Sequence, residues 1–198
     1  MTSPAWTGQL PRESTAVDRF PDCEDDELDL HDVYVRGAAG GTSGVLDKPE
    51  VVNVVLDGCD IAGYVANGGR ADRLLVKQSR LRGVTWAAGL LRDIVLEGVI
   101  GDDVSLRFST LRRVVFRDCT LPGIDLTEVT LDEVHFERCQ LAGARLHGAK
   151  VQQLRIEGCD LTACSGAAAL AGASVHPDDL ASLAPSLAEA LGLTVSPD

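Results

Sequence analysis

The stretch DCTLPGIDLTEVTLDEVHFERCQLAGARLHGAK, residues 118–150, decides the fold because its large apolar side chains recur at every fifth residue. These side chains are Leu121, Leu126, Leu131, Phe136, Leu141 and Leu146. A helix repeats its buried face every 3.6 residues and a strand every 2, so a spacing of five fits neither. The sequence therefore predicts a repeating structure of another kind.

The five-residue spacing extends from Leu46 to Leu161. Of its 24 positions, 23 are apolar, and Gly101 is the exception. A chain that is 45% hydrophobic would give about 11 by chance. The position two residues earlier is also mostly apolar or small, as at Val54, Cys59 and Tyr64. Two residues in each five therefore point inward and three point outward.

Two inward side chains with one outward residue between them form a short extended segment, and the other two residues must turn the chain. Four such turns close a coil of twenty residues. Residue types persist down columns of this period, as stacked coils require: Leu56, Val76, Leu96, Phe116, Phe136 and Ile156 in one, and Cys59, Ser79, Val99, Cys119, Cys139 and Cys159 in another. Glycines occupy turn positions, where a permissive backbone is needed: Gly58, Gly63, Gly83, Gly98, Gly123, Gly143 and Gly158.

With this pattern the chain resembles the pentapeptide-repeat proteins, and the triplets CDI (59–61) and CDL (159–161) are closest to the typical motif of that family. The resemblance implies an all-β solenoid, a right-handed quadrilateral β-helix of about 6–7 coils with a C-terminal helical cap. It covers residues 46–165 and an irregular coil at 20–40, where Asp25 breaks the spacing. The step from Val35 to Leu46 is eleven residues, so we expect GAAGGTSG (37–44) to form a loop or bulge.

We therefore expect four segments: a mobile amino-terminal tail (1–19), a first irregular coil with a glycine-rich loop (20–45), the β-helix (46–165) and a helical cap or dimerisation element (166–198). In the last segment, Leu180, Leu183, Leu187 and Leu191 follow helical spacing. Pro177 marks a helix start and Gly192 a stop. Pro185 is expected to divide this region into two short helices.

The charges argue against nucleic acid or an anionic membrane as a partner, because the net charge is −12. Residues 46–165 are nearly neutral, with 17 acids and 15 bases. Two columns alternate in sign and should hold the coils in register: Asp57, Lys77, Glu97, Arg117 and Glu137, and Arg73, Asp93, Arg113 and Glu133. No basic and apolar leader or membrane span is evident, so we expect a soluble, cytoplasmic protein.

Catalytic or metal chemistry is not indicated. Four of the six cysteines share one column, and three of them, Cys119, Cys139 and Cys159, are one coil apart. Small reduced side chains suit a packed interior there, and no cysteine pair has histidine partners. The four histidines are scattered, and none forms a triad with an outward nucleophile. Trp86 is read as a core ring that fills the space left by Ala66. We expect no enzyme activity, no cofactor and no metal.

One outward column is aliphatic where polar residues are expected: Val55, Leu75, Val95 and Val115. Strand preference alone could explain these residues. They could also form a contact stripe for a protein partner or a second copy of the chain. In the second case, Val95→Lys should keep the fold but lower the apparent mass or the capture of a partner.

The resemblance also suggests two functions. Well-understood members of the family protect DNA gyrase or topoisomerase IV from quinolones by mimicking DNA with an acidic rod, and they dimerise through a terminal element. The near-neutral coils depart from that pattern. The sequence therefore favours a protein-protein interaction scaffold that forms a homodimer and binds no nucleic acid directly. Gyrase protection is the alternative.

Overall fold

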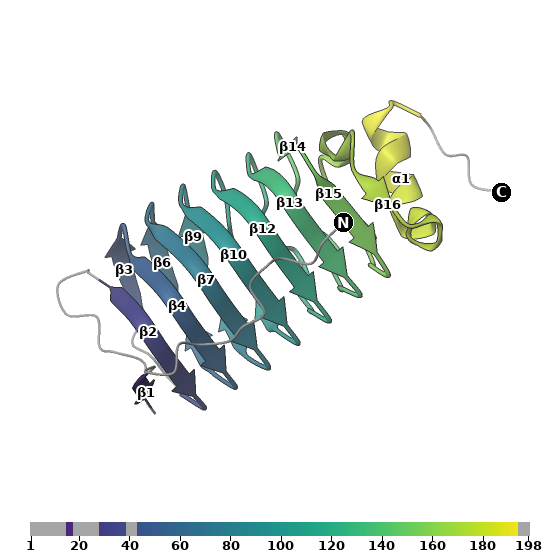
Figure 1. Cartoon of the computed structure of the whole chain (residues 1–198). Helices are drawn as coiled ribbons and strands as arrows, with labels where there is room; N and C mark the ends of the chain where they lie inside the picture. Colours follow the sequence, from purple (N-terminus) through teal and green to yellow (C-terminus); the bar gives the residue numbers. More distant parts are fainter. Residues whose placement is uncertain (1–14, 18–27, 39–42, 194–198) are drawn as a thin grey trace.

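The structure is a computed structural model that describes residues 15–17, 28–38 and 43–193. These residues form a rod of seven stacked coils with a helix at the carboxyl end (Figure 1). The predicted all-β solenoid with a helical cap is confirmed. None of the helices within these ranges has the length and apolar character needed to cross a membrane.

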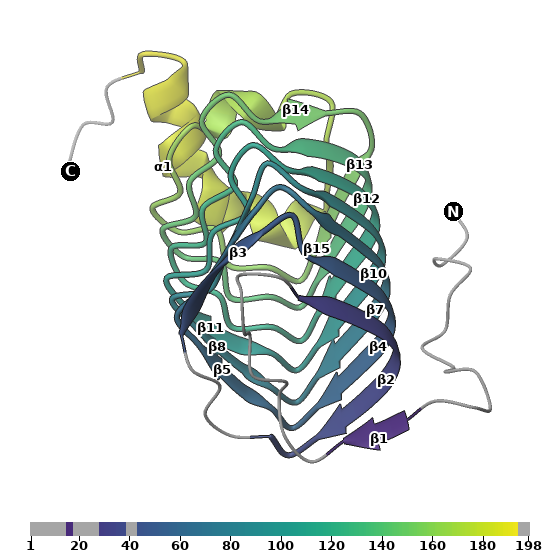
Figure 2. The same cartoon turned by 90° about the vertical axis from the view of Figure 1, so that its left-hand side faces the viewer.

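Parallel strands on successive coils form three sheets along the rod. In the largest sheet, the strands bend across two faces of each coil: β2 (Asp29–Arg36), β4 (Glu50–Asp57), β7 (Arg70–Lys77), β10 (Leu90–Glu97), β12 (Thr110–Arg117), β13 (Thr130–Glu137), β14 (Lys150–Val151) and β15 (Leu154–Glu157). A third face carries β5 (Asp60–Ala62), β8 (Arg80–Arg82) and β11 (Ile100–Asp102). The fourth carries β3 (Gly44–Asp47), β6 (Tyr64–Asn67) and β9 (Thr85–Ala87). Figure 2, which looks along the stack, shows the coils lying one behind another.

The period-20 columns stack as predicted. In the largest sheet, Leu56 pairs with Val76, and the register continues through Leu96, Phe116, Phe136 and Ile156. The column from Cys59 to Cys159 is buried throughout, with no member more than 5% exposed. These inward side chains form one continuous aliphatic core.

The corners use left-handed backbone, and all seven glycines predicted at turns have a positive φ. Several other corner residues adopt the same conformation, among them Arg73, Asp93 and Arg113, each with φ near 55°. These three lie in the middle of long strands, so the left-handed residue is where each strand bends from one face to the next. Each of these strands therefore continues through a bend and is eight residues long, although each of its flat segments is only about three residues long.

The first predicted coil is described only in part. Leu28, Leu30 and Val35 are buried, while Phe20, Cys23, Asp25 and half of the predicted loop (39–42) lie outside the described residues, so its irregularity stays a prediction. The strand β1 (Thr15–Val17) pairs in parallel with β2 and extends the largest sheet by one strand. It falls within the tail predicted to be mobile, residues 1–19, most of which lie outside the described residues.

The carboxyl end is covered by two 3₁₀ turns, η1 (Ala167–Leu170) and η2 (Pro177–Asp179), the strand β16 (Ser174–Val175) and the helix α1 (Leu180–Ala190). The prediction that Pro185 divides this region into two helices is wrong, because Pro185 lies inside α1. Proline at this position removes one hydrogen bond, to the carbonyl of Ala181, and Ala181 is exposed to water. The loss is too small to end the helix.

The cap also satisfies backbone donors of the last coil. Asp179 Oδ1 accepts a hydrogen bond from Cys159 N at 3.1 Å, and Ser182 Oγ accepts one from Leu161 N at 3.2 Å. Earlier coils use the same arrangement, since Ser79 Oγ accepts from Cys59 N at 3.0 Å. Asp179 thus continues the cysteine column after the coils have ended, and it closes an edge that would otherwise be open.

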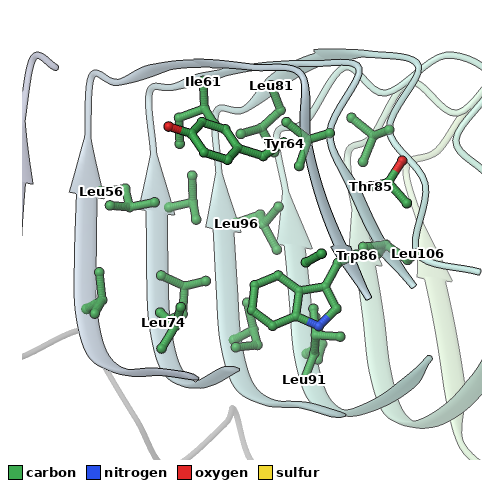
Figure 3. A pocket seen from close by; sticks show the side chains of 18 of the residues that line it. Leu56, Ile61, Tyr64, Leu74, Leu81, Thr85, Trp86, Leu91, Leu96 and Leu106 are labelled. Atoms are coloured by element: carbon green, nitrogen blue, oxygen red, sulfur yellow. The ribbon is translucent and has the colours of Figure 1, made fainter. Parts of the chain in front are cut away.

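The interior is less tightly packed in the amino-terminal coils. A cavity of about 140 Å³ lies among apolar side chains such as Leu56, Leu74 and Leu96 (Figure 3). Trp86 points inward as predicted, but its ring fills the space only in part. The ring lies against Gly89, where a Cβ would come within 2.1 Å of Trp86 Nε1.

Candidate protein-binding surface

The outer surface of the coils is dominated by ion pairs between neighbouring strands. Asp93 receives two hydrogen bonds from Arg113, at 2.6 and 2.7 Å, and Asp118 receives two from Arg138, at 2.7 and 2.8 Å. Of the two predicted ladders, the pairs Asp57–Lys77, Arg117–Glu137 and Asp93–Arg113 form. Nine of the 17 acids in residues 46–165 pair with an arginine or lysine: Asp57, Asp60, Asp72, Asp93, Asp118, Asp125, Asp132, Glu137 and Glu157. More than half of the coil acids are therefore neutralised locally.

The described cysteine side chains lie inside the coils. The five described cysteines are free and buried. A hydrogen bond with Cys119 and desolvation raise the pKa of the Cys139 thiol to about 12, so this thiol stays protonated at neutral pH. Within residues 15–17, 28–38 and 43–193, no group of three or more histidines, cysteines or acids could hold a metal ion.

The aliphatic stripe, Val55, Leu75, Val95 and Val115, lies on adjacent strands of the largest sheet. Each member stands between two core residues and points outward, as expected. Yet Val55, Val95 and Val115 are only 2, 9 and 4% exposed, and Leu75 is half-buried. Whatever its role, the stripe is therefore not an open surface in this structure.

Phe108 is an exposed aromatic residue that the periodic pattern did not single out. Its side chain is 48% exposed, and its φ of 60° places it in the left-handed region. That conformation costs a non-glycine residue about 1–2 kcal/mol. Among the described non-glycine residues with a positive φ, it is the only aromatic one. The Arg107 guanidinium lies over its ring, 5.0 Å from the centroid. Its place at a left-handed corner of a coil is the signal that could have identified it from the sequence.

A second apolar residue, Leu90, lies near this corner. It is 38% exposed and pairs across the sheet with Thr110, two residues after Phe108. Aromatic and arginine side chains together are the usual anchors of protein interfaces. The corner around Phe108 is thus a candidate contact site on a rigid support.

The predicted dimerisation helix divides its leucines between two environments. Leu183 is buried against the coils and Leu187 is half-buried. Leu180 and Leu191 are 47% and 75% exposed, and Leu193, just beyond the helix, is 61% exposed. These leucines share one face of α1: the middle of that face packs on the rest of the protein, and its two ends, with Leu193, are exposed at the end of the rod.

Comparison with protein families supports the repeat architecture over part of the chain. A family model described as pentapeptide repeats matches residues 124–162 in eight copies. No curated protein matches the sequence. Among solved structures, a trypsin-treated variant of QnrB1, a plasmid-mediated fluoroquinolone resistance protein, aligns over 92% of this chain and 99% of its own, with 14% identity and a TM-score of 0.45. HetL, a pentapeptide-repeat protein involved in heterocyst differentiation in the cyanobacterium Nostoc, aligns over 76% and 78%, with 13% identity and a TM-score of 0.38.

Proposed function

We propose that this pentapeptide-repeat protein is a non-enzymatic scaffold that binds another protein through the corner around Phe108. The observation that carries the proposal is the 48% exposure of Phe108 with the Arg107 guanidinium over its ring. Aromatic and arginine side chains are common anchors of protein interfaces. The stacked coils hold this corner rigidly, so the ring and Arg107 would meet a partner with little loss of conformational entropy.

The same surface disfavours a DNA mimic, which is the alternative function. A protein that imitates duplex DNA must present unpaired negative charge to a basic groove. Here nine coil acids already share their charge with arginine or lysine, and several of the pairs are bidentate. Binding of gyrase or topoisomerase IV would first require many of these pairs to open.

The test is affinity capture from the native cell with the wild-type protein, with Phe108→Ala and with Ile100→Ala. Ile100 is a matched control because it is also 48% exposed but lies on another face. We expect Phe108→Ala to reduce retention of the principal partner at least about tenfold, as loss of an interface anchor does. Ile100→Ala should retain it.

Equal retention by both variants would refute binding through Phe108. A gyrase subunit retained equally by all three proteins, together with relief of quinolone inhibition of supercoiling, would instead establish the alternative function.

We also propose that two copies of the chain associate at the carboxyl end of the rod. Leu180, Leu191 and Leu193 are exposed there, and a two-fold axis would bury the same patch on both copies. Leu191→Glu should shift the molar mass measured by light scattering from dimer to monomer. The solenoid should keep its circular dichroism, because Leu191 does not contact the core. A wild-type protein that is monomeric at all concentrations would contradict this proposal.

A further inference from the structure

Four side chains that pack against the core are only half-buried, and all four line the cavity (Figure 3): Leu74, Val84, Trp86 and Leu96. Leu74 stands in its column between Val54 and Ile94, which are 0 and 1% exposed. Because the neighbours on both sides are buried, the accessible area of Leu74 faces the cavity. The cavity lies inside the rod, since β4 and β12 flank the strands β7 and β10 that carry Leu74 and Leu96.

Smaller residues in these coils account for the cavity. Ala66 occupies the position that Leu126 fills three coils later, and Val76 occupies the position that Phe136 fills. Leu126 and Phe136 are 1 and 3% exposed, so the same positions are closely packed farther along the rod. The space is therefore a property of the sequence of the amino-terminal coils and is not required by the coil geometry.

The chemistry of the walls decides what the cavity can hold. The lining side chains are aliphatic or aromatic except for Thr85. A buried water molecule needs two to four polar partners, which such walls do not supply. An apolar cavity of about 150 Å³ in another protein binds benzene or xenon, and the volume here is about 140 Å³. An apolar occupant would restore the dispersion contacts that the lining side chains lack on this side.

We propose that this cavity is a binding site for a small apolar molecule about as large as a single aromatic ring. The indole of Trp86 forms part of the wall, and an aromatic ligand can stack against it. Phe108, Arg107 and Leu90 are not among the lining residues, so this inference does not rest on the proposed contact site at Phe108.

The test is calorimetric titration of the full chain with benzene and with phenol. We expect benzene to bind at one site and phenol to bind at least about tenfold more weakly, because its hydroxyl would be buried among apolar groups. Val76→Phe places a ring in the cavity at a column position where Phe116 and Phe136 already occur. It should weaken benzene binding at least about tenfold. Ile156→Phe is the matched control, because it lies in the same column but does not line the cavity, and it should bind benzene like the wild type.

A second measurement keeps the test decisive if Val76→Phe does not fold. Nuclear Overhauser effects from benzene protons to the methyl groups of Leu74 and Leu96 should locate the ligand in the wild-type protein. The inference is overturned if benzene does not bind, if phenol binds as tightly, or if these effects reach only methyl groups outside the cavity. Benzene binding by folded Val76→Phe as tight as that of Ile156→Phe would overturn it as well.

Discussion

Replacement of Phe136 by alanine is expected to lower the free energy of unfolding by about 3–5 kcal/mol, the usual cost of truncating a buried aromatic side chain. Phe136 is 3% exposed and stacks on Phe116 of the preceding coil, with ring centroids 4.6 Å apart and an interplanar angle of 17°. Alanine would leave a void between two coils and remove an aromatic contact worth about 0.5–1.5 kcal/mol beyond its area. Urea denaturation followed by circular dichroism measures the change.

Phe108→Ala is the matched control, since it removes the same side chain from an exposed corner. It should change stability by less than about 0.5 kcal/mol. Similar losses in the two variants would mean that burial does not distinguish the rings, and the assignment of inward and outward positions would fail. A loss near 1 kcal/mol at Phe136 would mean that the coils collapse into the space.

The positions that face inward could be predicted from the sequence because each coil repeats the geometry of the one before it. Once Leu56 faces inward, a period of twenty places Val76, Leu96 and Phe116 above it, and parallel pairing fixes the register. The glycines at the corners could be predicted for the same reason. Residues 124–162, where the family model matches, show this regularity most clearly: Leu126, Leu131 and Leu141 are at most 2% exposed.

Features that break the repeat could not be predicted in the same way. Phe108 occupies a corner where the period carries no apolar requirement, so only its conformation and exposure single it out. The low exposure of Val95 is another such feature, because an outward position in the five-residue spacing predicts an exposed side chain. The prediction for Pro185 considered only its local effect on the helix. In the structure, Leu183 packs in the hydrophobic core and holds the helix together around Pro185.

The cavity is another feature that could not be predicted from the sequence. Trp86 and Ala66 were expected to compensate in volume, but the indole points over Gly89 and leaves space among Leu74, Leu91 and Leu96. The period-20 columns predict which residues stack on one another, but not which rotamer each ring adopts. The volume of the cavity depends on that rotamer. Packing within the amino-terminal coils is therefore less predictable than their topology.

Asp179→Ala is expected to lower the free energy of unfolding by about 1–3 kcal/mol, because it leaves the buried Cys159 N–H without a partner. Asp179 is 5% exposed, so water cannot easily replace the carboxylate. Its position twenty residues after Cys159 shows that the cap uses the period of the coils to close their last edge. Asp179→Asn keeps an acceptor oxygen in place and should lose less than half as much.

The rate of hydrogen exchange at the Cys159 amide measures directly how well Asp179 protects this amide. It should accelerate in Asp179→Ala by more than the amide of Cys119, which lies two coils from the edge. If both amides accelerate equally, the rod unfolds as one unit and the cap adds to its global stability. If the Cys159 amide alone accelerates, the last coil opens independently, as expected when each coil contacts only its neighbours. If neither amide accelerates, Asp179 is not the group that closes the edge.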